Sequence, residues 1–374
     1  MVSPSLRIVI VDRPSWYEPV IEARELARVG AEVVVGWAQR PDRPADADRG
    51  FPAGDLSRAE LSAISSAYVP PSCTTEERVI EMAQGAAGIL AVRANICARV
   101  MDALPNLRAI GRYGVGVDNV DVEAATQRGI AVINTPGFCA REVADHTMML
   151  VLACARKGRM QDAMMRRGEW GRDQASPMAA LYTQTLGLIG FGQIAREVTR
   201  RATAFGLTVI AYDAYVAPDE MQSFGVRAVG IDELLAASDF VSIHAPLTPY
   251  TRHLIGEAQL RAMKRTAFLI NTARGGLVDE PALIKGLQEG WLAGAGLDVF
   301  EREPLEKSHP LLHLDNVVLT PHIGGLSDEG QEACRMRLAR AIGDVLVGKW
   351  PVGPELHNPA FKDTVAGGSR WGTA

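Results

Sequence analysis

Short apolar runs alternate with segments of helical composition along the first part of this chain. The runs have the length of buried strands, and helix-length segments at 19–28, 75–84 and 122–128 separate several of them. The apolar runs before residue 140 are 6–11, 32–35, 88–92, 107–110 and 131–133. Strands that alternate with helices form parallel sheets with right-handed crossovers, so this part of the chain predicts an α/β domain.

A second alternating series follows a strongly apolar helix pattern at 142–156 and a more polar stretch to Trp170. Its predicted strands are 185–189, 207–212, 240–244, 267–271, 294–297 and 317–320, with helical segments between them. The second series therefore predicts another parallel sheet, covered by helices on both faces. Together the two series predict an α/β protein that contains a Rossmann-type doubly wound sheet and a second α/β domain.

The start of the second series has the sequence pattern of a dinucleotide-binding unit. Gly190 permits a tight strand-to-helix turn, Gly192 lets the backbone approach a pyrophosphate, and Ala195 allows close packing of helix on strand. The N-terminus of the helix at 193–205 offers unpaired N–H groups to the phosphates. Asp213 closes the next strand, where a carboxylate accepts hydrogen bonds from the ribose hydroxyls and repels a 2′-phosphate. The unit therefore predicts NAD rather than NADP.

Proline residues and mixed charge interrupt the alternation between residues 40 and 71. We interpret this segment as a surface insertion, with a short helix at 57–65. It either shapes the mouth of a cleft or is a tolerated decoration, and its composition favours the second reading.

Composition and charge exclude several classes of function. The chain has 374 residues, of which 47% are hydrophobic and 22% charged, with a formal net charge of -5. These values are typical of a globular protein with room for two domains, and the absence of a basic stripe argues against nucleic acid as a partner. The longest central apolar run, 148–155, is too short to span a bilayer, so no membrane segment is expected.

The five cysteines are scattered, and they show neither a CxxC pair nor the spacing of metal ligands. The first apolar run ends at Asp12 and is too short for the core of a signal peptide. These features predict reduced thiols, a cytoplasmic location and no metal site.

Residues 108–119 read RAIGRYGVGVDN and predict a strand that runs into a glycine-rich turn. Gly114 and Gly116 would let backbone N–H groups point into a cleft, where they could hold a carboxylate together with Arg112. The alternative is a tight turn without a ligand, and the residues alone favour neither reading.

Three successive strands of the second series end in chemically useful side chains. Arg274 follows the strand at 267–271, Glu301 and Glu303 follow 294–297, and His322 follows 317–320. Open α/β sheets bind their ligands beyond the carboxyl ends of the strands. Taken singly, each side chain could be an ordinary surface or core residue; their joint placement favours a catalytic group, in which the residues do not distinguish Glu303 from Glu301.

These residue types suit hydride transfer between a nicotinamide and a carbonyl carbon. A histidine can exchange the proton of the carbonyl oxygen, and a carboxylate on its other ring nitrogen fixes the ring and favours the imidazolium. An arginine can hold a substrate carboxylate and polarise the carbonyl while it stays charged.

From about Ile89 to Gly325 the chain resembles the D-isomer-specific 2-hydroxyacid dehydrogenases. The matching motifs are RYGVGVDNVD, GLIGFGQIAR, HAPLTPYTRHLI, INTARGGLVDE, AGLDVFEREP and LTPHIGG. The resemblance implies an NAD-dependent oxidoreductase acting on a 2-oxo or D-2-hydroxy acid, and a homodimer formed through the cofactor domain. It also implies a flavodoxin-like substrate-binding domain at 1–136 and 326–374, to which the helix pattern at 327–347 returns, and a Rossmann domain at 137–325.

The resemblance also implies roles for individual residues. Arg274, Glu303 and His322 would form the catalytic triad; Gly190, Gly192, Gln193, Ile194, Asp213, His244, Pro246, Thr251, Thr272, Ala273 and Asp298 would bind the cofactor; Arg93, Arg112, Val115 and Gly116 would bind the substrate. Within these sets, Gln193 and Ile194 would meet the pyrophosphate and Asp298 would orient the nicotinamide amide. Val115 and Gly116 would offer backbone N–H groups to the substrate carboxylate.

The chain departs from the common family pattern at three positions: Ala94, Cys139 and Asp145 stand where many members have serine, asparagine and glutamate. The VADHT segment and Arg112 are similar to the C-terminal-binding-protein branch, whose animal members act as transcriptional corepressors. Two alternatives to a 2-hydroxyacid dehydrogenase follow: a binding module that senses NAD(H) without turnover, and a relative that oxidises formate or phosphite.

Overall fold

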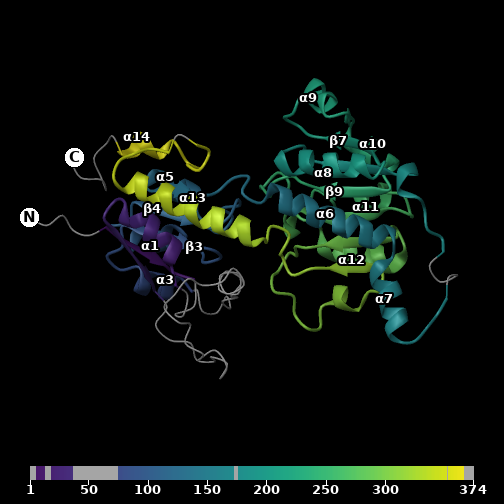
Figure 1. Cartoon of the computed structure of the whole chain (residues 1–374), viewed down its shortest axis with the longest axis horizontal. Helices are drawn as coiled ribbons and strands as arrows, with labels where there is room; N and C mark the ends of the chain where they lie inside the picture. Colours follow the sequence, from purple (N-terminus) through teal and green to yellow (C-terminus); the bar gives the residue numbers. More distant parts are fainter. Residues whose placement is uncertain (1–5, 13–17, 37–74, 172–175, 352, 366–374) are drawn as a thin grey trace, which may run out of the picture. The chain divides into compact units, whose positions relative to one another are not determined.

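The computed structural model describes residues 6–12, 18–36, 75–171, 176–351 and 353–365, which fall into two compact units (Figure 1). The first unit is Met1–Phe138 with Ser327–Ala374, and the second is Cys139–Leu326. The insertion predicted at 40–71, with its short helix, lies outside the described residues. Within the described residues, no helix combines the length and apolar character needed to cross a bilayer.

The first unit is built on a five-stranded parallel sheet in the order β2-β1-β3-β4-β5. Its strands are β1 (Leu6–Ile10), β2 (Ala31–Val35), β3 (Gly88–Ala91), β4 (Ala109–Arg112) and β5 (Ala131–Ile133). Its helices are α1 (Val20–Ala27), α3 (Glu76–Met82), α4 (Ala98–Asp102), α5 (Val122–Gln127), α13 (Asp328–Leu346) and α14 (Phe361–Val365). This strand order is that of flavodoxin, so the predicted flavodoxin-like domain is confirmed.

Helix α13 brings the C-terminal part of the chain back onto the first sheet, as the resemblance implied. It packs on α1 and β4, and Figure 1 shows it in yellow-green beside α1. Ser327 caps its N-terminus, because the Ser327 hydroxyl accepts a hydrogen bond from the Gly330 N–H at 3.0 Å. Leu338, Ile342 and Leu346 of this helix are buried with strand residues of one face of the sheet.

The second unit contains a seven-stranded parallel sheet in the order β12-β11-β10-β9-β6-β7-β8. Its strands are β6 (Thr185–Ile189), β7 (Thr208–Tyr212), β8 (Arg227–Ala228), β9 (Phe240–Ile243), β10 (Phe268–Asn271), β11 (Gly294–Leu297) and β12 (Val317–Leu319). The order reverses between β6 and β9, as in Rossmann folds, where the dinucleotide binds at the reversal. The predicted Rossmann-type sheet is therefore confirmed.

Helices and short 3₁₀ segments cover both faces of this sheet. They are α6 (Ala140–Ala155), α7 (Gly158–Arg166), η4 (Leu181–Thr183), α8 (Gln193–Ala204), α9 (Pro218–Ser223), α10 (Ile231–Ala237), α11 (Glu257–Ala262), η5 (Gly275–Leu277), α12 (Glu280–Glu289) and η6 (Pro310–His313). Apolar α6 packs against α8 and also contacts β10, β11 and β12 (Figure 1). Its buried residues Val151 and Cys154 share a core with Leu186 and Ile270 of the sheet.

Candidate active site

The turn between β6 and α8 has the shape that a bound pyrophosphate requires. Gly190 has a φ of +93°, and a Cβ there would lie 2.8 Å from the backbone nitrogen of Ala245, so only glycine fits. Gly192 is the N-cap residue of α8, and a Cβ on it would meet nothing within 4 Å. The space before the helix N-terminus, where Gln193 and Ile194 begin the first turn, is therefore open to an anionic group.

Asp213 follows β7 and is held by the backbone of the same turn. One carboxylate oxygen, Oδ2, accepts a hydrogen bond from the Phe191 N–H at 2.7 Å, and Oδ1 accepts from the N–H groups of Tyr215 and Val216 at 2.8 and 3.1 Å. Burial raises the pKa of Asp213, but these hydrogen bonds outweigh it and the net pKa is lowered. Asp213 is therefore an anion with a fixed orientation at the end of the strand.

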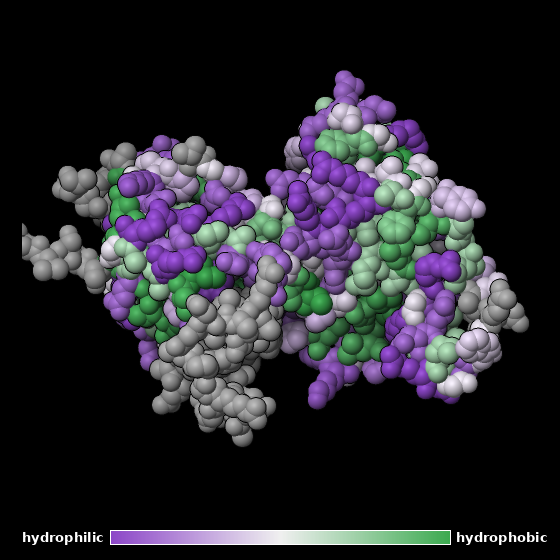
Figure 2. Space-filling model, viewed as in Figure 1, coloured by the Kyte–Doolittle hydropathy of each residue, from purple (hydrophilic) through white to green (hydrophobic). Residues whose placement is uncertain are grey.

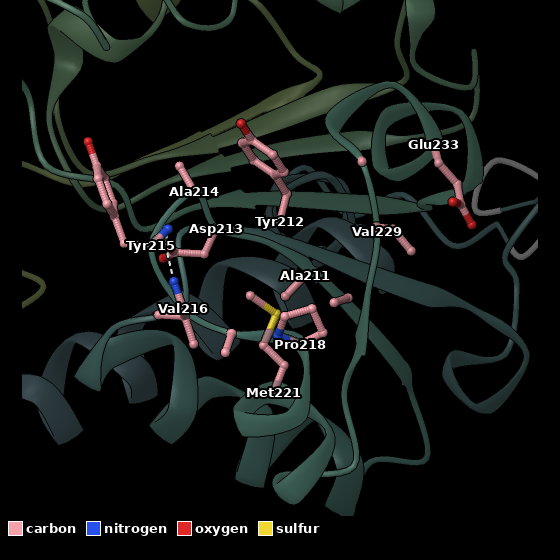
Figure 3. Close-up of a pocket in the computed structure, with 13 residues that line it drawn as sticks. Ala211, Tyr212, Asp213, Ala214, Tyr215, Val216, Pro218, Met221, Val229 and Glu233 are labelled. Carbon is pink, nitrogen blue, oxygen red and sulfur yellow. Dashed lines mark hydrogen bonds between the residues drawn. The ribbon is translucent and has the colours of Figure 1, made fainter.

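A cavity of about 620 Å³ opens beside Asp213 at the ends of β7 and β8 (Figure 3). Among the described residues that line it, Asp213 and Glu233 are acidic, and no lysine or arginine is present. The side chains of Tyr212 and Tyr215 stand on the same side of Asp213 in Figure 3. These surroundings suit ribose hydroxyls and disfavour a 2′-phosphate.

His244 follows β9, the strand that hydrogen-bonds β6 on the other side of the reversal. Its Nε2 lies 2.9 Å from the hydroxyl of Ser242. Burial lowers the pKa of His244 to about 4, so the imidazole is neutral at physiological pH. A neutral histidine at this position adds no positive charge that would attract a 2′-phosphate.

The low pKa of His244 predicts a specific loss of stability in acid. In the unfolded chain a histidine binds a proton near pH 6.5, whereas native His244 resists protonation until about pH 4. Stability should therefore fall as the pH drops from about 6.5 to about 4, and this contribution should level off below that. Urea unfolding of His244→Gln should show a flatter pH dependence in that window than the wild type. Exposed His313→Gln serves as the control, and equal slopes for wild type and His244→Gln would contradict the assignment.

The loops after β9 and β10 contain the other residues that the resemblance assigns to the cofactor. The Thr251 hydroxyl donates a hydrogen bond to the Pro246 carbonyl oxygen at 2.7 Å, which closes the loop after β9. The Thr272 hydroxyl lies 2.9 Å from that of Thr147 on α6. The Ala273 N–H donates to the Asn271 side chain at 3.0 Å. Hydrogen bonds within each loop, and one from the second loop to α6, thus fix both loops.

Arg274, Glu303 and His322 follow β10, β11 and β12, which are neighbours in the sheet. His322 Nδ1 lies 2.6 Å from Glu303 Oε2, and the Phe300 N–H donates to Glu303 Oε1 at 3.1 Å. A carboxylate only accepts, so Nδ1 carries a proton and Nε2 is left for a substrate. The backbone beside Arg274 touches the loop of Glu303, since a Cβ on Gly275 would lie 1.9 Å from the Phe300 carbonyl carbon.

The structure distinguishes the two glutamates that the sequence left open. Glu301 turns to a different histidine: its Oε1 lies 2.6 Å from His253 Nε2. Its backbone N–H donates to Glu280 Oε2 at 3.2 Å. Glu303 is therefore the carboxylate bound to His322. Glu301 instead holds the same loop to His253 and Glu280.

Asp298 is buried beneath the His322 turn and binds it at several points. Its Oδ1 accepts from the Thr320 hydroxyl at 2.6 Å and from the Ile323 N–H at 2.9 Å, and its Oδ2 accepts from the Gly324 N–H at 2.8 Å. Burial raises the pKa of Asp298, but hydrogen bonds from His146, Thr320 and the two backbone groups lower it overall. Both carboxylate oxygens thus hold the turn, in addition to any contact with a cofactor amide.

In the first unit, the glycine-rich turn after β4 is braced by its own arginine. Arg112 Nη1 donates to the Tyr113 carbonyl oxygen at 2.8 Å, and it lies 1.7 Å from where a Cβ of Gly114 would be. Gly114 has a φ of +131°, so only glycine fits above this guanidinium. Val115 and Gly116 follow on the turn, and Val115 is exposed. The Arg112 guanidinium therefore packs against the turn and holds its backbone.

Asp12, which the sequence marked only as the end of an apolar run, organises the segment that carries Arg93. Its carboxylate accepts hydrogen bonds from the N–H groups of Val92, Arg93 and Ala94 at 2.5 to 2.9 Å. Arg93 is exposed, and Ala94 is fully buried. The position of Asp12 directly after a strand, at the edge where ligands bind, was the available signal for this role.

Two of the three departures from the family pattern, Cys139 and Asp145, lie in the second unit. Asp145 on α6 is bound to Arg201 Nε of α8 at 2.5 Å and is largely exposed. Cys139 is buried at the start of α6, and its Sγ lies 3.0 Å from where a Cβ of Gly325 would be. Cys139 therefore packs behind the turn that contains His322, whereas Asp145 takes part in a surface ion pair.

The family model for the NAD-binding domain of D-isomer specific 2-hydroxyacid dehydrogenases matches residues 148–324. A glyoxylate reductase from Korarchaeum cryptofilum is 46% identical over 269 residues, which are 70% of this chain and 80% of that protein. This chain belongs to the D-isomer specific 2-hydroxyacid dehydrogenase family. Its predicted family, fold and oxidoreductase class are thereby confirmed.

Two further members of the 2-hydroxyacid dehydrogenase family extend the comparison. A D-3-phosphoglycerate dehydrogenase from Methanocaldococcus jannaschii is 46% identical over 278 residues, 74% of this chain but 52% of that protein, so the chain spans about half of its length. The crystal structure of a D-isomer specific 2-hydroxyacid dehydrogenase from Lactobacillus delbrueckii ssp. bulgaricus, in its NAD-complexed form, superposes with a TM-score of 0.68. It is 26% identical, covering 92% of this chain and 99% of the other. The predicted cofactor, NAD, is thus confirmed, and all three relatives are named as enzymes.

Proposed function

We propose that this protein reduces a small 2-oxo acid to the corresponding 2-hydroxy acid with NADH, with glyoxylate as the first candidate. The observation that carries this proposal is the His322–Glu303 pair, 2.6 Å apart, on strand ends next to that of Arg274. The similarity to glyoxylate reductases supports the choice of substrate. In this proposal the second unit binds NAD and the first unit binds the substrate.

The side chains of the second unit divide the chemistry between them. NADH, held by the turn at Gly190, the N-terminus of α8 and Asp213, would supply the hydride for the carbonyl carbon when bound. Nε2 of His322 delivers the proton to the carbonyl oxygen, while Glu303 holds Nδ1 and stabilises the imidazolium before the transfer. Arg274 keeps its charge throughout, so it can bind the substrate carboxylate and polarise the carbonyl. Water then reprotonates His322 and closes the proton balance.

We infer that the turn after β4, in the first unit, binds a carboxylate group through its backbone N–H groups. Val115 and Gly116 lie on a turn that is held rigid by Arg112 and by Asn134, whose side-chain nitrogen donates to the Val115 carbonyl oxygen at 2.5 Å. Backbone N–H groups on a fixed turn bind an anion without a loss of side-chain entropy. Arg93, on the segment held by Asp12, adds a positive charge to the first unit.

A reductase panel tests the proposed function directly. Purified protein is mixed with NADH and with glyoxylate, pyruvate, hydroxypyruvate or longer 2-oxo acids, and NADH oxidation is followed by absorbance. Turnover with at least one of these acids is expected, with glyoxylate among the best. NADH binding without turnover of any 2-oxo acid would contradict the proposal and favour a binding module. Turnover with NAD⁺ and formate or phosphite in a parallel assay would instead identify the protein as a dehydrogenase of those anions, with NAD⁺ as the acceptor.

Replacing Asp213 by alanine should relax the preference for NADH over NADPH. Asp213 is an oriented anion beside an acidic cavity, and a 2′-phosphate placed there would be repelled. The ratio of kcat/KM for NADH to that for NADPH should fall by about tenfold or more, because close like-charge contacts are worth a kcal/mol or more. Asp219→Ala, an exposed acid on α9, is the matched control. An unchanged ratio in Asp213→Ala would remove Asp213 as the ribose ligand.

We propose that the protein is a homodimer that associates through its second unit. Large hydrophobic side chains are exposed there on or after α6 and α7: Met149, Met165 and Trp170, the last 85% exposed. Figure 2 shows hydrophobic surface gathered over α6. Exposed patches of this kind mark association surfaces. Sedimentation should give about twice the chain mass of 40.3 kDa, and Trp170→Glu should lower it; a monomeric wild type would contradict this.

We also propose that the protein lies in the cytoplasm. Among the described residues, no disulfide joins Cys97, Cys139, Cys154 and Cys334. Free thiols are typical of a reducing compartment. Fractionation of cells that express the full chain tests this location, and recovery outside the cytoplasm would contradict it.

A further inference from the structure

His146 lies on α6, far in sequence from the proposed catalytic residues, yet it contacts the network beneath His322. Its side chain is 13% exposed. Its Nε2 lies 2.8 Å from the Thr320 hydroxyl oxygen and 3.4 Å from Asp298 Oδ1. Neither the family motifs nor the proposed chemistry assigns a role to this histidine.

The direction of the hydrogen bonds in this network follows from the donors available. A threonine hydroxyl has a single hydrogen, and Thr320 gives it to Asp298 Oδ1 at 2.6 Å, because an ionised carboxylate can only accept. The Thr320 oxygen must then accept from His146. Nε2 of His146 therefore carries a hydrogen, and the chain of donors runs from His146 through Thr320 to Asp298.

Asp298 in turn holds the turn that presents His322. Besides binding the N–H groups of Ile323 and Gly324, Asp298 accepts the His322 N–H on its backbone carbonyl oxygen at 2.8 Å. His322 itself has a φ of +56°, a left-handed conformation that is unfavourable for a residue with a Cβ. Such a conformation persists only where the surroundings fix it, and here Asp298 provides most of the fixing hydrogen bonds.

We propose that His146 is a positioning residue for the reaction: its Nε2–H, through Thr320 and Asp298, holds the turn that presents His322 to the substrate. This proposal rests on the proposed function, because it concerns the orientation of the same proton donor. A catalytic group must be held within about half an ångström of its working geometry, so a loosened turn lowers turnover more than cofactor affinity. His146 itself does not touch the substrate.

Paired substitutions at both ends of the hydrogen bond test this proposal. His146→Leu and Thr320→Val remove the donor and the relay, whereas His146→Gln and Thr320→Ser keep a hydrogen-bonding group in nearly the same place. We expect the first pair to lower kcat by about tenfold with an NADH Kd within about twofold of wild type. The second pair should stay within about threefold of wild type in kcat.

The double variant His146→Leu/Thr320→Val separates positioning from general damage to the fold. Residues that act through one chain of hydrogen bonds are not additive, so the double variant should be no slower than the slower single variant. A kcat for His146→Leu close to wild type would overturn the proposal, as would equal losses in His146→Leu and His146→Gln, or multiplied losses in the double variant. A wild type without turnover would instead refute the proposed function. Wild-type turnover that is lost in His322→Ala but kept in His146→Leu would refute only this inference.

Discussion

Replacing His322 by alanine is expected to lower kcat by two or more orders of magnitude while NADH affinity stays nearly unchanged. His322 is the proposed proton donor, and a positioned general acid contributes about 10²–10⁴-fold to turnover. The groups proposed to hold the cofactor lie on other elements: the turn at Gly190, the N-terminus of α8 and Asp213 after β7. Loss of the imidazole should therefore change the chemical step and leave binding of NADH intact.

The measurement combines stopped-flow reduction of the preferred 2-oxo acid with titration of NADH fluorescence. His313→Ala is the matched control, because His313 is an exposed histidine at the end of η6 and outside the proposed site. It should behave as wild type in both assays. If His322→Ala kept more than about a tenth of the wild-type kcat, or lost NADH affinity in proportion to turnover, His322 would not be the proton donor.

Exchanging Glu303 for glutamine should slow the reaction. Glu303 Oε2 accepts the Nδ1 hydrogen of His322 at 2.6 Å, and a hydrogen bond to a charged acceptor is stronger than one to a neutral amide. Without the carboxylate, the imidazole is held less firmly in its orientation. The kcat for the preferred 2-oxo acid should therefore fall by about tenfold or more, since a hydrogen bond to a charged group is worth about 1.5–3 kcal/mol.

Glu301→Gln provides the matched control, because both glutamates lie on the same loop. Glu301 is bound to His253, so its replacement should leave kcat close to that of the wild type. An equal loss of kcat in both variants would show that the net charge of the loop, rather than contact with His322, sets the rate. A loss in Glu301→Gln alone would reverse the roles that we give to the two residues.

The alternation of apolar runs and helical segments was enough to predict the two parallel sheets. The runs at 131–133, 185–189 and 294–297 coincide with β5, β6 and β11, because a strand buried on both faces is apolar along its whole length. The two-residue strand β8 (Arg227–Ala228) was missed, since it is too short and polar to show a pattern. Ends of other strands differ by one or two residues, because apolar residues next to a strand, such as Val11, Leu107 and Ala267, are buried without being part of it.

Placement of the site at the strand ends also followed from the sequence, since parallel strands bring their carboxyl ends to one edge. The partner of His322 followed from the family resemblance but not from the residues alone, because Glu301 and Glu303 both precede Pro304 on an irregular loop. Their directions depend on loop geometry, which periodicity does not determine. His146 and Thr320 were missed for a related reason: a buried histidine on an apolar helix shows no ligand pattern, and its hydrogen bond spans 174 residues of sequence.

We propose that His322, paired with Glu303, presents its Nε2 to the carbonyl oxygen of a 2-oxo acid. A crystal structure with NADH and oxamate, an unreactive analogue of a 2-oxo acid, tests it most directly. We expect His322 Nε2 within about 2.6–3.2 Å of the analogue's amide carbonyl oxygen, with Nδ1 still on Glu303 and Arg274 on the carboxylate. An imidazole turned away from the nicotinamide, or an analogue held by other side chains, would rule out His322 as the proton donor.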